Sequence, residues 1–342
     1  MFKKVFICCA LVLSANALFS MEKEFKKEQT PQKISTTCVA ELKHENKSTI
    51  FCVAISPTGK LLATASSDKT AKIWDKNGVL IKTLGHEDKV TSVAFSPKEN
   101  FILTTSQQKA FLWTIDGTFL RTFYDCKHAA FSPDSDNKII IFDNDDNDVT
   151  CWEGIDDEWR AYEPKNSYHF LDQLYGYSHD VKKSYPGATI NYCTMHWISG
   201  PCAFFFTPGA EEINISFGKH GKISFQAKDP YSESRWMQEN DEDGDLNDYY
   251  IPDPLKINTV AAVMKPDGSG SALVAIGYIG NSDIGTTLTL LEIAKNGHIT
   301  TLVDWDHEGS DDIHSIAFSP DGKFILTGAH DNTAKLWSIN NL

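Results

Sequence analysis

Histidines and carboxylates recur in pairs near both ends of the chain. His44 is followed by Asp68, and His307 is followed by Asp331 at the same spacing. A His–Asp pair can orient a general base in a catalytic triad when a nucleophile lies beside it. No nucleophile accompanies these pairs, and the chain has no Gly-x-Ser-x-Gly motif and no His-Glu-x-x-His motif. We therefore expect the pairs to be structural, and we predict no catalytic residue, no metal ligand and no cofactor.

A second candidate for chemistry is the stretch 236–253, which carries seven Asp and Glu residues and no Lys or Arg. Asp241, Asp243 and Asp245 alternate as in a calcium-binding loop, but the twelfth position of that loop is Tyr250 rather than Glu. We interpret the stretch as an acidic surface insertion, with cation binding as the alternative.

The N-terminus has the pattern of a secretory signal. Lys3 and Lys4 precede an apolar run at residues 5–19, which is shorter than the roughly 20 residues needed to cross a bilayer. We expect residues 1–20 to be a cleaved signal peptide and residues 21–35 to be a flexible leader. This predicts a secreted or periplasmic protein, whose mature chain has no transmembrane segment.

Cysteine chemistry depends on this prediction. Six cysteines follow the predicted signal: Cys38, Cys52, Cys126, Cys151, Cys193 and Cys202. An even number in an exported chain permits disulfides, although six cysteines allow 15 pairings. Cys193 and Cys202 flank a predicted hairpin turn and could pair across it. Cys151 precedes Trp152, where other repeats have Ile or Leu, so we expect it to pack as a small core residue.

Short strands joined by turns must position these side chains. Residues 313–318, 323–329 and 333–338 read as three strands, and Ser319-Pro320-Asp321-Gly322 forms the first turn between them. The same text recurs at residues 50–75, IFCVAISPTGKLLATASSDKTAKIWD. Three tryptophans that end such units follow one another at a spacing of 39 residues: Trp74, Trp113 and Trp152. A repeat with this period predicts an array of similar units.

The unit resembles the WD40 repeat, which is a four-stranded blade of a β-propeller. The resemblance implies an all-β propeller over residues 36–342, with seven blades and six as the alternative. The last repeat lacks a fourth strand, because only residues 338–342 follow its tryptophan. Residues 36–42 form a strand that precedes the first repeat and has no blade of its own. We expect this N-terminal strand to join the last blade and close the ring, because closure removes two exposed sheet edges.

The resemblance also implies a buried hydrogen-bonded set of His, Thr, Asp and Trp in a complete repeat. The set is present in the first and last repeats: His44, Thr64, Asp68 and Trp74, and His307, Thr327, Asp331 and Trp337. In the second repeat Gln107 stands at the Asp position, so we expect a weaker network there.

Relatives of this family usually bind partners through the loops beside the His and Asp positions. On this chain those loops contain Glu45, Asn46, Ser67, Lys69, Glu87, Asp88, Ser106, Gln108, Asp311, Asp312, His330 and Asn332. Most of these side chains are acidic or neutral, so the expected partner is a protein with a basic or polar surface.

The net charge of −14 and pI near 5.2 argue against a nucleic-acid partner, which needs a basic face. We expect a monomeric, non-catalytic platform for protein–protein interaction. One alternative is a propeller hydrolase with a metal or carboxylate site at the central channel. Another is an envelope- or carbohydrate-binding module, which the aromatic surplus at residues 159–185 favours.

Overall fold

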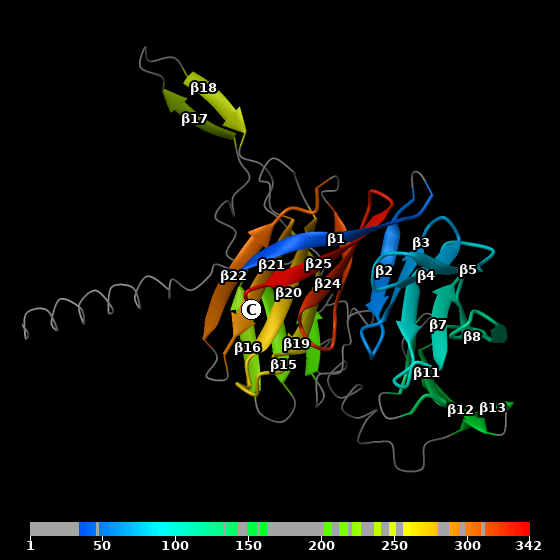
Figure 1. Cartoon of the computed structure of the whole chain (residues 1–342). Helices are drawn as coiled ribbons and strands as arrows, with labels where there is room; N and C mark the ends of the chain where they lie inside the picture. The colour runs from blue at the N-terminus through cyan, green and yellow to red at the C-terminus, as the bar shows by residue number, and fades with distance from the viewer. Residues whose placement is uncertain are drawn as a thin grey trace, which may run out of the picture.

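The chain folds into a series of small antiparallel sheets (Figure 1). The structure is a computed structural model, and it describes residues 34–45, 48–126, 128–132, 135–142, 149–155, 158–162, 202–206, 212–217, 221–226, 236–240, 246–250, 256–279, 287–294, 298–308 and 312–342. Every helix or strand within these ranges is a β-strand, so the prediction of an all-β protein is confirmed.

Five of the sheets have four strands, and most of these strands are six residues or shorter. The first sheet in the chain contains β2 (Ile50–Ile55), β3 (Leu61–Ser66), β4 (Thr70–Asp75) and β5 (Leu80–Gly85). The second contains β6 (Ser92–Phe95), β7 (Phe101–Ser106), β8 (Lys109–Thr114) and β9 (Phe119–Phe123). The third contains β10 (His128–Phe131), β11 (Lys138–Phe142), β12 (Val149–Ile155) and β13 (Glu158–Tyr162).

Two further four-stranded sheets come from the C-terminal part of the chain. One contains β19 (Lys256–Met264), β20 (Ala272–Ile279), β21 (Leu288–Ile293) and β22 (Ile299–Trp305). The other contains β23 (Ile313–Phe318), β24 (Phe324–Ala329) and β25 (Thr333–Asn340), together with β1 (Ser35–Lys43). Between these regions lie a three-stranded sheet and a separate hairpin: β14 (Cys202–Phe206), β15 (Glu212–Phe217) and β16 (Gly221–Gln226), and β17 (Trp236–Asn240) and β18 (Leu246–Tyr250).

The recurring Ser-Pro turn has a defined structural role between the first two strands of a sheet. The Oγ of Ser56 accepts a hydrogen bond from the backbone N of Leu61 at 3.1 Å, and Ser319 does the same for Phe324 at 2.9 Å. The fourth turn residue has a positive φ, which is 68° at Gly322. Only glycine reaches this region without a steric cost, and this explains why Gly recurs at the position.

The N-terminal strand completes the last sheet, as predicted. β1 runs antiparallel to β25, from the pair Ser35 and Asn340 to the pair Lys43 and Thr333. Figure 1 shows β1 in blue lying along β25 in red, so the two ends of the chain share one sheet. The predicted closure by the N-terminal strand is therefore confirmed. Leu42 of this strand also enters the core between its own sheet and the next one.

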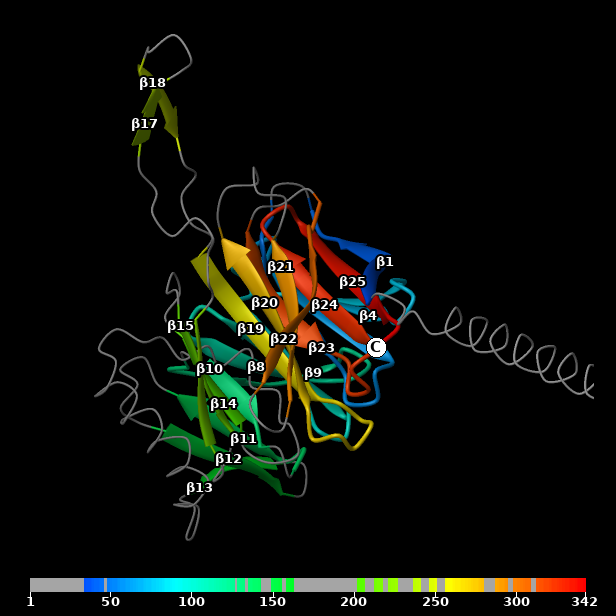
Figure 2. The ribbon, with the colours of Figure 1, turned by 90° about the vertical axis from the view of Figure 1, so that its left-hand side faces the viewer.

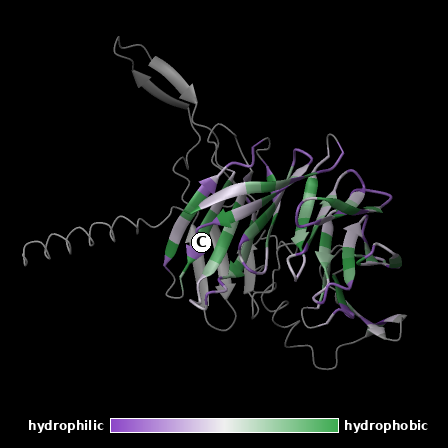
Figure 3. Cartoon of the chain, viewed as in Figure 1, coloured by the Kyte–Doolittle hydropathy of each residue, from purple (hydrophilic) through white to green (hydrophobic). Residues whose placement is uncertain are grey.

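Neighbouring sheets pack through their first strands. β23 contacts both β2 and β19, and β2 contacts β6 in turn. Figure 2 shows β19–β22 beside β23–β25 in this stack. Apolar residues fill each interface, and Figure 3 shows hydrophobic positions along the strands with hydrophilic ones concentrated in the loops. Each sheet is too small to bury its own faces, so stability depends on the stacking of neighbours.

Several expectations concern parts of the chain that the structure describes only in part. The described residues contain five four-stranded sheets and one three-stranded sheet, so seven blades remain a prediction. Part of the acidic insertion forms the hairpin β17–β18, while residues 241–245 lie outside the described residues. Cys193 also lies outside them. Cys38, Cys52, Cys126 and Cys151 are not in disulfide bonds, and all but Cys38 are buried.

Truncating Leu42 tests the closure. Leu42 is fully buried and packs with Ile50 and Leu336, so Leu42→Ala should lower the free energy of unfolding by about 2–5 kcal/mol. Val39 lies on the same strand and is half exposed, so Val39→Ala should cost less than about 0.5 kcal/mol. Urea unfolding of both variants measures the difference. Equal effects would mean that β1 does not close the fold.

Candidate functional site

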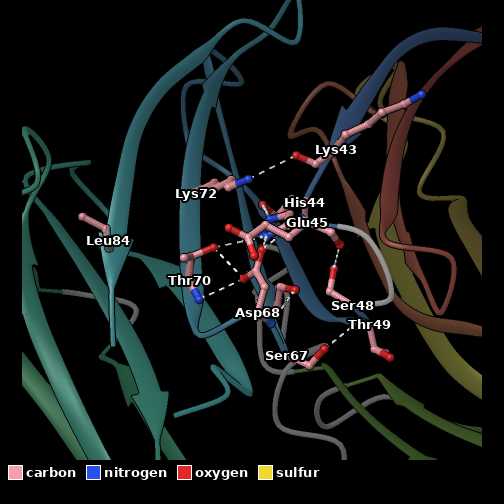
Figure 4. Close-up of polar contacts among 12 residues, drawn as sticks. Lys43, His44, Glu45, Ser48, Thr49, Ser67, Asp68, Thr70, Lys72 and Leu84 are labelled. Carbon is pink, nitrogen blue, oxygen red and sulfur yellow. Dashed lines mark hydrogen bonds and ion pairs between the residues drawn. The ribbon is translucent and has the colours of Figure 1, made fainter. Parts of the chain in front are cut away.

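The first sheet contains a buried chain of hydrogen bonds. The indole N–H of Trp74 donates to Thr64 Oγ1 at 2.9 Å, and Thr64 Oγ1 lies 2.6 Å from His44 Nε2. His44 Nδ1 lies 2.8 Å from a carboxylate oxygen of Asp68. If Nδ1 carries the proton, then Thr64 donates to Nε2 and every polar group in the set has one partner. Figure 4 shows His44 and Asp68 facing each other between their two loops.

Electrostatics agree with a neutral His44 in this set. Burial lowers the pKa of His44, although Asp68 opposes that shift. Burial by itself would raise the pKa of Asp68, but hydrogen bonds from His44 and Thr70 outweigh it and keep that pKa well below its usual range. Because Thr64 occupies Nε2, this imidazole has no free nitrogen to act as a general base.

Asp68 also shapes the hairpin turn between β3 and β4. Its second oxygen accepts hydrogen bonds from the backbone N and the hydroxyl of Thr70 at 2.9 and 2.6 Å. Lys69, between them, has a φ of 69°. An Asp side chain that caps its own turn in this way stabilises a conformation that Lys otherwise avoids. The carboxylate therefore joins the loop after β1 to the β3–β4 turn.

The second sheet lacks that carboxylate and uses a different arrangement. His86 Nε2 lies 2.8 Å from Thr104 Oγ1, which accepts the indole N–H of Trp113 at 2.9 Å. His86 Nδ1 lies 3.1 Å from a backbone oxygen, that of Leu84, instead of a carboxylate. Gln107, at the Asp position, turns outward and donates to Asp88. The loop and the turn are therefore not joined through the histidine in this sheet.

The last sheet contains the same four residue types but not the same hydrogen bonds. Trp337 donates to Thr327 at 2.9 Å, whereas His307 Nδ1 is 4.0 Å from Asp331. Both ring nitrogens of His307 are buried without a hydrogen-bond partner. The buried ammonium of Lys335 donates instead to the backbone oxygens of His307 and Glu308. The structure thus brings all four residues together but leaves the imidazole unpaired.

The pH dependence of stability should report on His307. Burial lowers its pKa to about 4, with Asp331 opposing the shift and Lys335 assisting it. A histidine in the unfolded chain titrates near 6.5. Above about pH 6.5, His307 is neutral in both states, so its buried position costs no protonation energy. As the pH falls toward about 4, the unfolded chain binds a proton that the folded protein does not, and the free energy of unfolding decreases. When the pH is lowered from 7 to 4, the wild type should lose about 3 kcal/mol more of its free energy of unfolding than His307→Gln does. Urea unfolding measures it, and a constant difference would show that His307 binds a proton as readily in the folded protein as in the unfolded chain.

A second group of side chains comes from irregularities in the first strands of three adjacent sheets. The pairing register skips Phe51 in β2, Asn258 in β19 and His314 in β23, so each strand bulges there. A bulge redirects the side chain of the extra residue out of the sheet. Because these strands are neighbours, the three bulges occur close together.

The side chains of Phe51 and Asn258 both lie beside His314. Asn258 Nδ2 donates to the backbone oxygen of Ile313 at 2.6 Å and lies 3.4 Å from His314 Nδ1. The His314 ring lies 6.1 Å from the ring of Phe51 and 6.0 Å from that of His330. We call Phe51, Asn258, His314 and His330 the bulge cluster.

Charged groups surround the bulge cluster. Lys89 Nζ lies 5.8 Å from the centre of the Phe51 ring, within the range of a cation–π contact. Burial lowers the pKa of His314, Asp312 opposes the shift and His330 assists it. The Nε2 of His314 is buried without a hydrogen-bond partner. The cluster therefore combines aromatic surface, a neutral imidazole and nearby charges of both signs.

The loop residues predicted to face a partner occupy different environments. Lys69, Gln108 and Asn332 lie at the tight hairpin turns with positive φ, and Glu45 and Glu87 are exposed. Ser106 does not suit the prediction, because it is 2% exposed and its hydroxyl donates to the backbone oxygen of Asp88. Two of the predicted residues lie outside the described residues: Asn46 and Asp311.

Sequence reasoning missed Phe51, Asn258 and His314. A signal for two of them was present, since Phe51 and His314 each stand five residues before the serine of a Ser-Pro turn. Asn258 follows no such spacing, and the strand that contains it is longer.

The described residues contain no group of three or more His, Cys, Asp or Glu placed to hold a metal ion. Within the same part of the chain, no helix has the length and apolar character to span a bilayer.

Three segments of the chain match a known family of repeats. The WD40 family, described as "WD domain, G-beta repeat", matches residues 36–75, 78–114 and 296–338. The chain is 33% identical over 151 residues to the "WD repeat-containing protein WDS homolog" of Arabidopsis thaliana, covering 37% of this chain and 28% of that protein. It is 28% identical over 293 residues to the "Nuclear distribution protein PAC1" of Candida albicans, covering 82% of this chain and 50% of that protein. The chain thus spans half or less of these relatives.

Solved structures agree on the fold. The WD40 repeats of RRP9 superpose with a TM-score of 0.55 at 13% identity, covering 90% of this chain and all of that one. The β-propeller domain of Cps50 (Swd1) from Myceliophteria thermophila gives a TM-score of 0.53 at 15% identity, covering 90% and 100% of the two chains.

These comparisons contradict the predicted localisation. A relative aligned over 82% of the chain is named as a nuclear distribution protein. The prediction of a secreted or periplasmic protein is therefore wrong, and an apolar N-terminal run was insufficient ground for it. The repeats, their relatives and the superposed folds agree with one another, and propellers of this kind typically support protein–protein interaction. Three segments of the chain thus match WD40 repeats, and its fold is that of a WD40-repeat β-propeller.

Proposed function

We propose that this protein is a non-catalytic scaffold that binds a partner protein through the bulge cluster and the loops around it. The observation that carries the proposal is the meeting of Phe51, Asn258 and His314 from three separate sheets. Each of these residues lies at a bulge, where the ladder of backbone hydrogen bonds is interrupted and the side chain leaves the regular alternation of the strand.

The composition of the bulge cluster suits protein recognition. Aromatic and planar polar side chains provide contact area at a low cost in conformational entropy. Phe51, Asn258 and His314 are each partly exposed, so part of their surface is accessible to a bound chain.

The surrounding loops set the preferred charge of the partner. Glu45, Glu87, Asp88 and Asp312 outnumber the nearby lysines, Lys69 and Lys89, and the whole chain has a net charge of −14. Complementary charge accelerates association and excludes partners of like charge. A partner with a basic or polar surface therefore suits these loops, and the bulge cluster would contact a side chain near the middle of that surface.

The buried His–Asp pair supports a non-catalytic role. Its imidazole is held by Thr64 on one side and Asp68 on the other, and His44 is buried. A general base must reach a substrate proton, and neither ring nitrogen of His44 is available for this. The set instead fixes the loop after β1, which lies beside the interacting face.

Substitution of the bulge cluster tests the proposal. Phe51→Ala with His314→Ala should weaken binding of the partner recovered by affinity capture by about 2 kcal/mol or more, roughly 30-fold in Kd. Phe324→Ala, an exposed aromatic on β24, is the matched control and should leave Kd unchanged. Quantitative capture by mass spectrometry followed by calorimetry on the purified pair gives the comparison. Loss of binding in the control alone, or in neither variant, would overturn the proposal.

The charge of the loops is tested separately. Asp312→Lys should slow association with that partner several-fold at low ionic strength, and the effect should fade as salt is added, because screening shortens the reach of surface charge. Stopped-flow measurement of the association rate checks this. A rate that is unchanged, or faster, would mean that the partner is not basic.

A further inference from the structure

The outer strands of three adjacent sheets share a bulge at the same place. In β1, β5 and β9 the register skips one residue directly after the residue paired with the tryptophan of the repeat. The skipped residues are Val39, Ile81 and Leu120. All three are large and apolar, and they are 49%, 53% and 43% exposed.

Further apolar side chains flank the bulges. Val79 and Leu80 at the start of β5 and Phe119 at the start of β9 are all exposed. We call the outer strands β1, β5 and β9 with these side chains the rim. Scattered exposed apolar residues are ordinary, but a contiguous group of them marks an interaction surface.

The rim is continuous from one sheet to the next. A Cβ added to Gly78, in the turn before β5, would lie 2.9 Å from Ala40 of β1. A Cβ added to Gly117, in the turn before β9, would lie 2.7 Å from the side chain of Lys82 on β5. Each turn therefore packs against the outer strand of the preceding sheet, and this contact brings the three outer strands side by side.

A bulge at this place in an outer strand does not by itself expose the skipped side chain. β22 has a bulge at the equivalent place, and its skipped residue is Leu302. That side chain is partly buried against the core shared with β23–β25. The exposure of Val39, Ile81 and Leu120 is thus particular to three sheets.

The edges of the rim are open to pairing. β5 and β9 are the last strands of their sheets, and in the part of the chain that the structure describes no strand pairs with their outer edges. An open edge presents unpaired backbone N–H and C=O groups, which an extended peptide can join as an additional strand. The run of exposed residues from Val79 to Thr83 matches a peptide of about five residues, roughly 17 Å long.

The charge of the rim differs from that of the whole chain. Residues 76–85 and 117–124, which contain β5 and β9, have no Asp or Glu, although acidic residues outnumber basic ones by 46 to 32 overall. β1 carries one carboxylate, Glu41, which forms an ion pair with Lys43 at 2.9 Å. Lys76 and Lys82 are exposed there. The nearest carboxylates, Asp75 and Asp116, accept hydrogen bonds within their own turns.

We propose that the rim is a second docking surface, where an extended segment of a partner protein with alternating apolar and acidic residues adds as a strand to β5. The apolar side chains of the segment would contact Leu80 and Ile81, and its carboxylates would face Lys76 and Lys82. A second copy of this chain fits less well, because pairing of two such edges would bring Lys82 near its own counterpart.

A synthetic peptide tests the surface directly. The probe is an acetylated heptapeptide of alternating Glu and Ile, and the comparison peptide has Lys in place of Glu. The acidic peptide should bind at least about tenfold more tightly at low salt, and it should slow hydrogen exchange of the β5 amides. N-methylation of alternate amides in the peptide should abolish binding, because strand addition needs those donors.

Variants of this protein complete the test. Ile81→Lys and Lys82→Glu should each weaken binding of the acidic peptide about tenfold, while Lys60→Glu, at an exposed turn outside the rim, should not. Circular dichroism with thermal melting establishes that the variants fold, and Ile81→Asn serves if Ile81→Lys does not. Equal binding of both peptides, exchange protection that omits β5, or self-association of the free protein that Ile81→Lys abolishes would each overturn the proposal.

Discussion

The pairing of the first strand with the last is the contact on which the rest of the structure depends. Small four-stranded sheets cannot bury both faces alone, so each one relies on its neighbours. The junction of β1 with β25 completes the sheet that packs between β19–β22 and β2–β5. Leu42 enters the shared core at that junction, and His44 is the first residue after β1. Closure therefore positions both a packing interface and the loop that carries the buried histidine.

Interruptions of the regular ladder determine what the surface can bind. Regular pairing directs side chains into the interfaces between sheets, where they are apolar and buried. A bulge releases one residue from this alternation. Bulges in the first strands bring Phe51, Asn258 and His314 together, and the exposed Val39, Ile81 and Leu120 lie at bulges in the outer strands. β-Bulges thus occur both at the polar, aromatic group on one surface and at the apolar group on another.

The three histidine sets show how one pattern tolerates different chemistry. His44 is fully satisfied by Thr64 and Asp68, whereas His86 uses a backbone oxygen and His307 has no partner. The tryptophan-to-threonine bond is common to all three. The bond that recurs is the one within a sheet, and the bonds that vary are those to the connecting loops. Loop geometry, which depends on the neighbouring sheet, therefore decides whether the imidazole is paired.

Much of the architecture was predictable because it depends on local chemistry. The Ser-Pro turns, the regularly spaced tryptophans and the missing fourth strand are properties of short segments, and they were sufficient to predict the repeats and the closure by residues 36–42. The localisation was misjudged because an apolar N-terminal run does not by itself report the compartment in which a folded domain works.

By itself, the amino-acid sequence determined the turns, the strand order within a repeat and the pairing of the two ends. These follow from the backbone preferences of a few residues and from the need to bury an apolar face. Only the tertiary structure decided which side chains meet. Phe51, Asn258 and His314 are far apart in the chain, and their contact requires three sheets in a fixed order with a bulge in each. The shared spacing from the Ser-Pro turn marks Phe51 and His314 as equivalent positions, but it does not reveal that the register skips there or that Asn258 lies beside them.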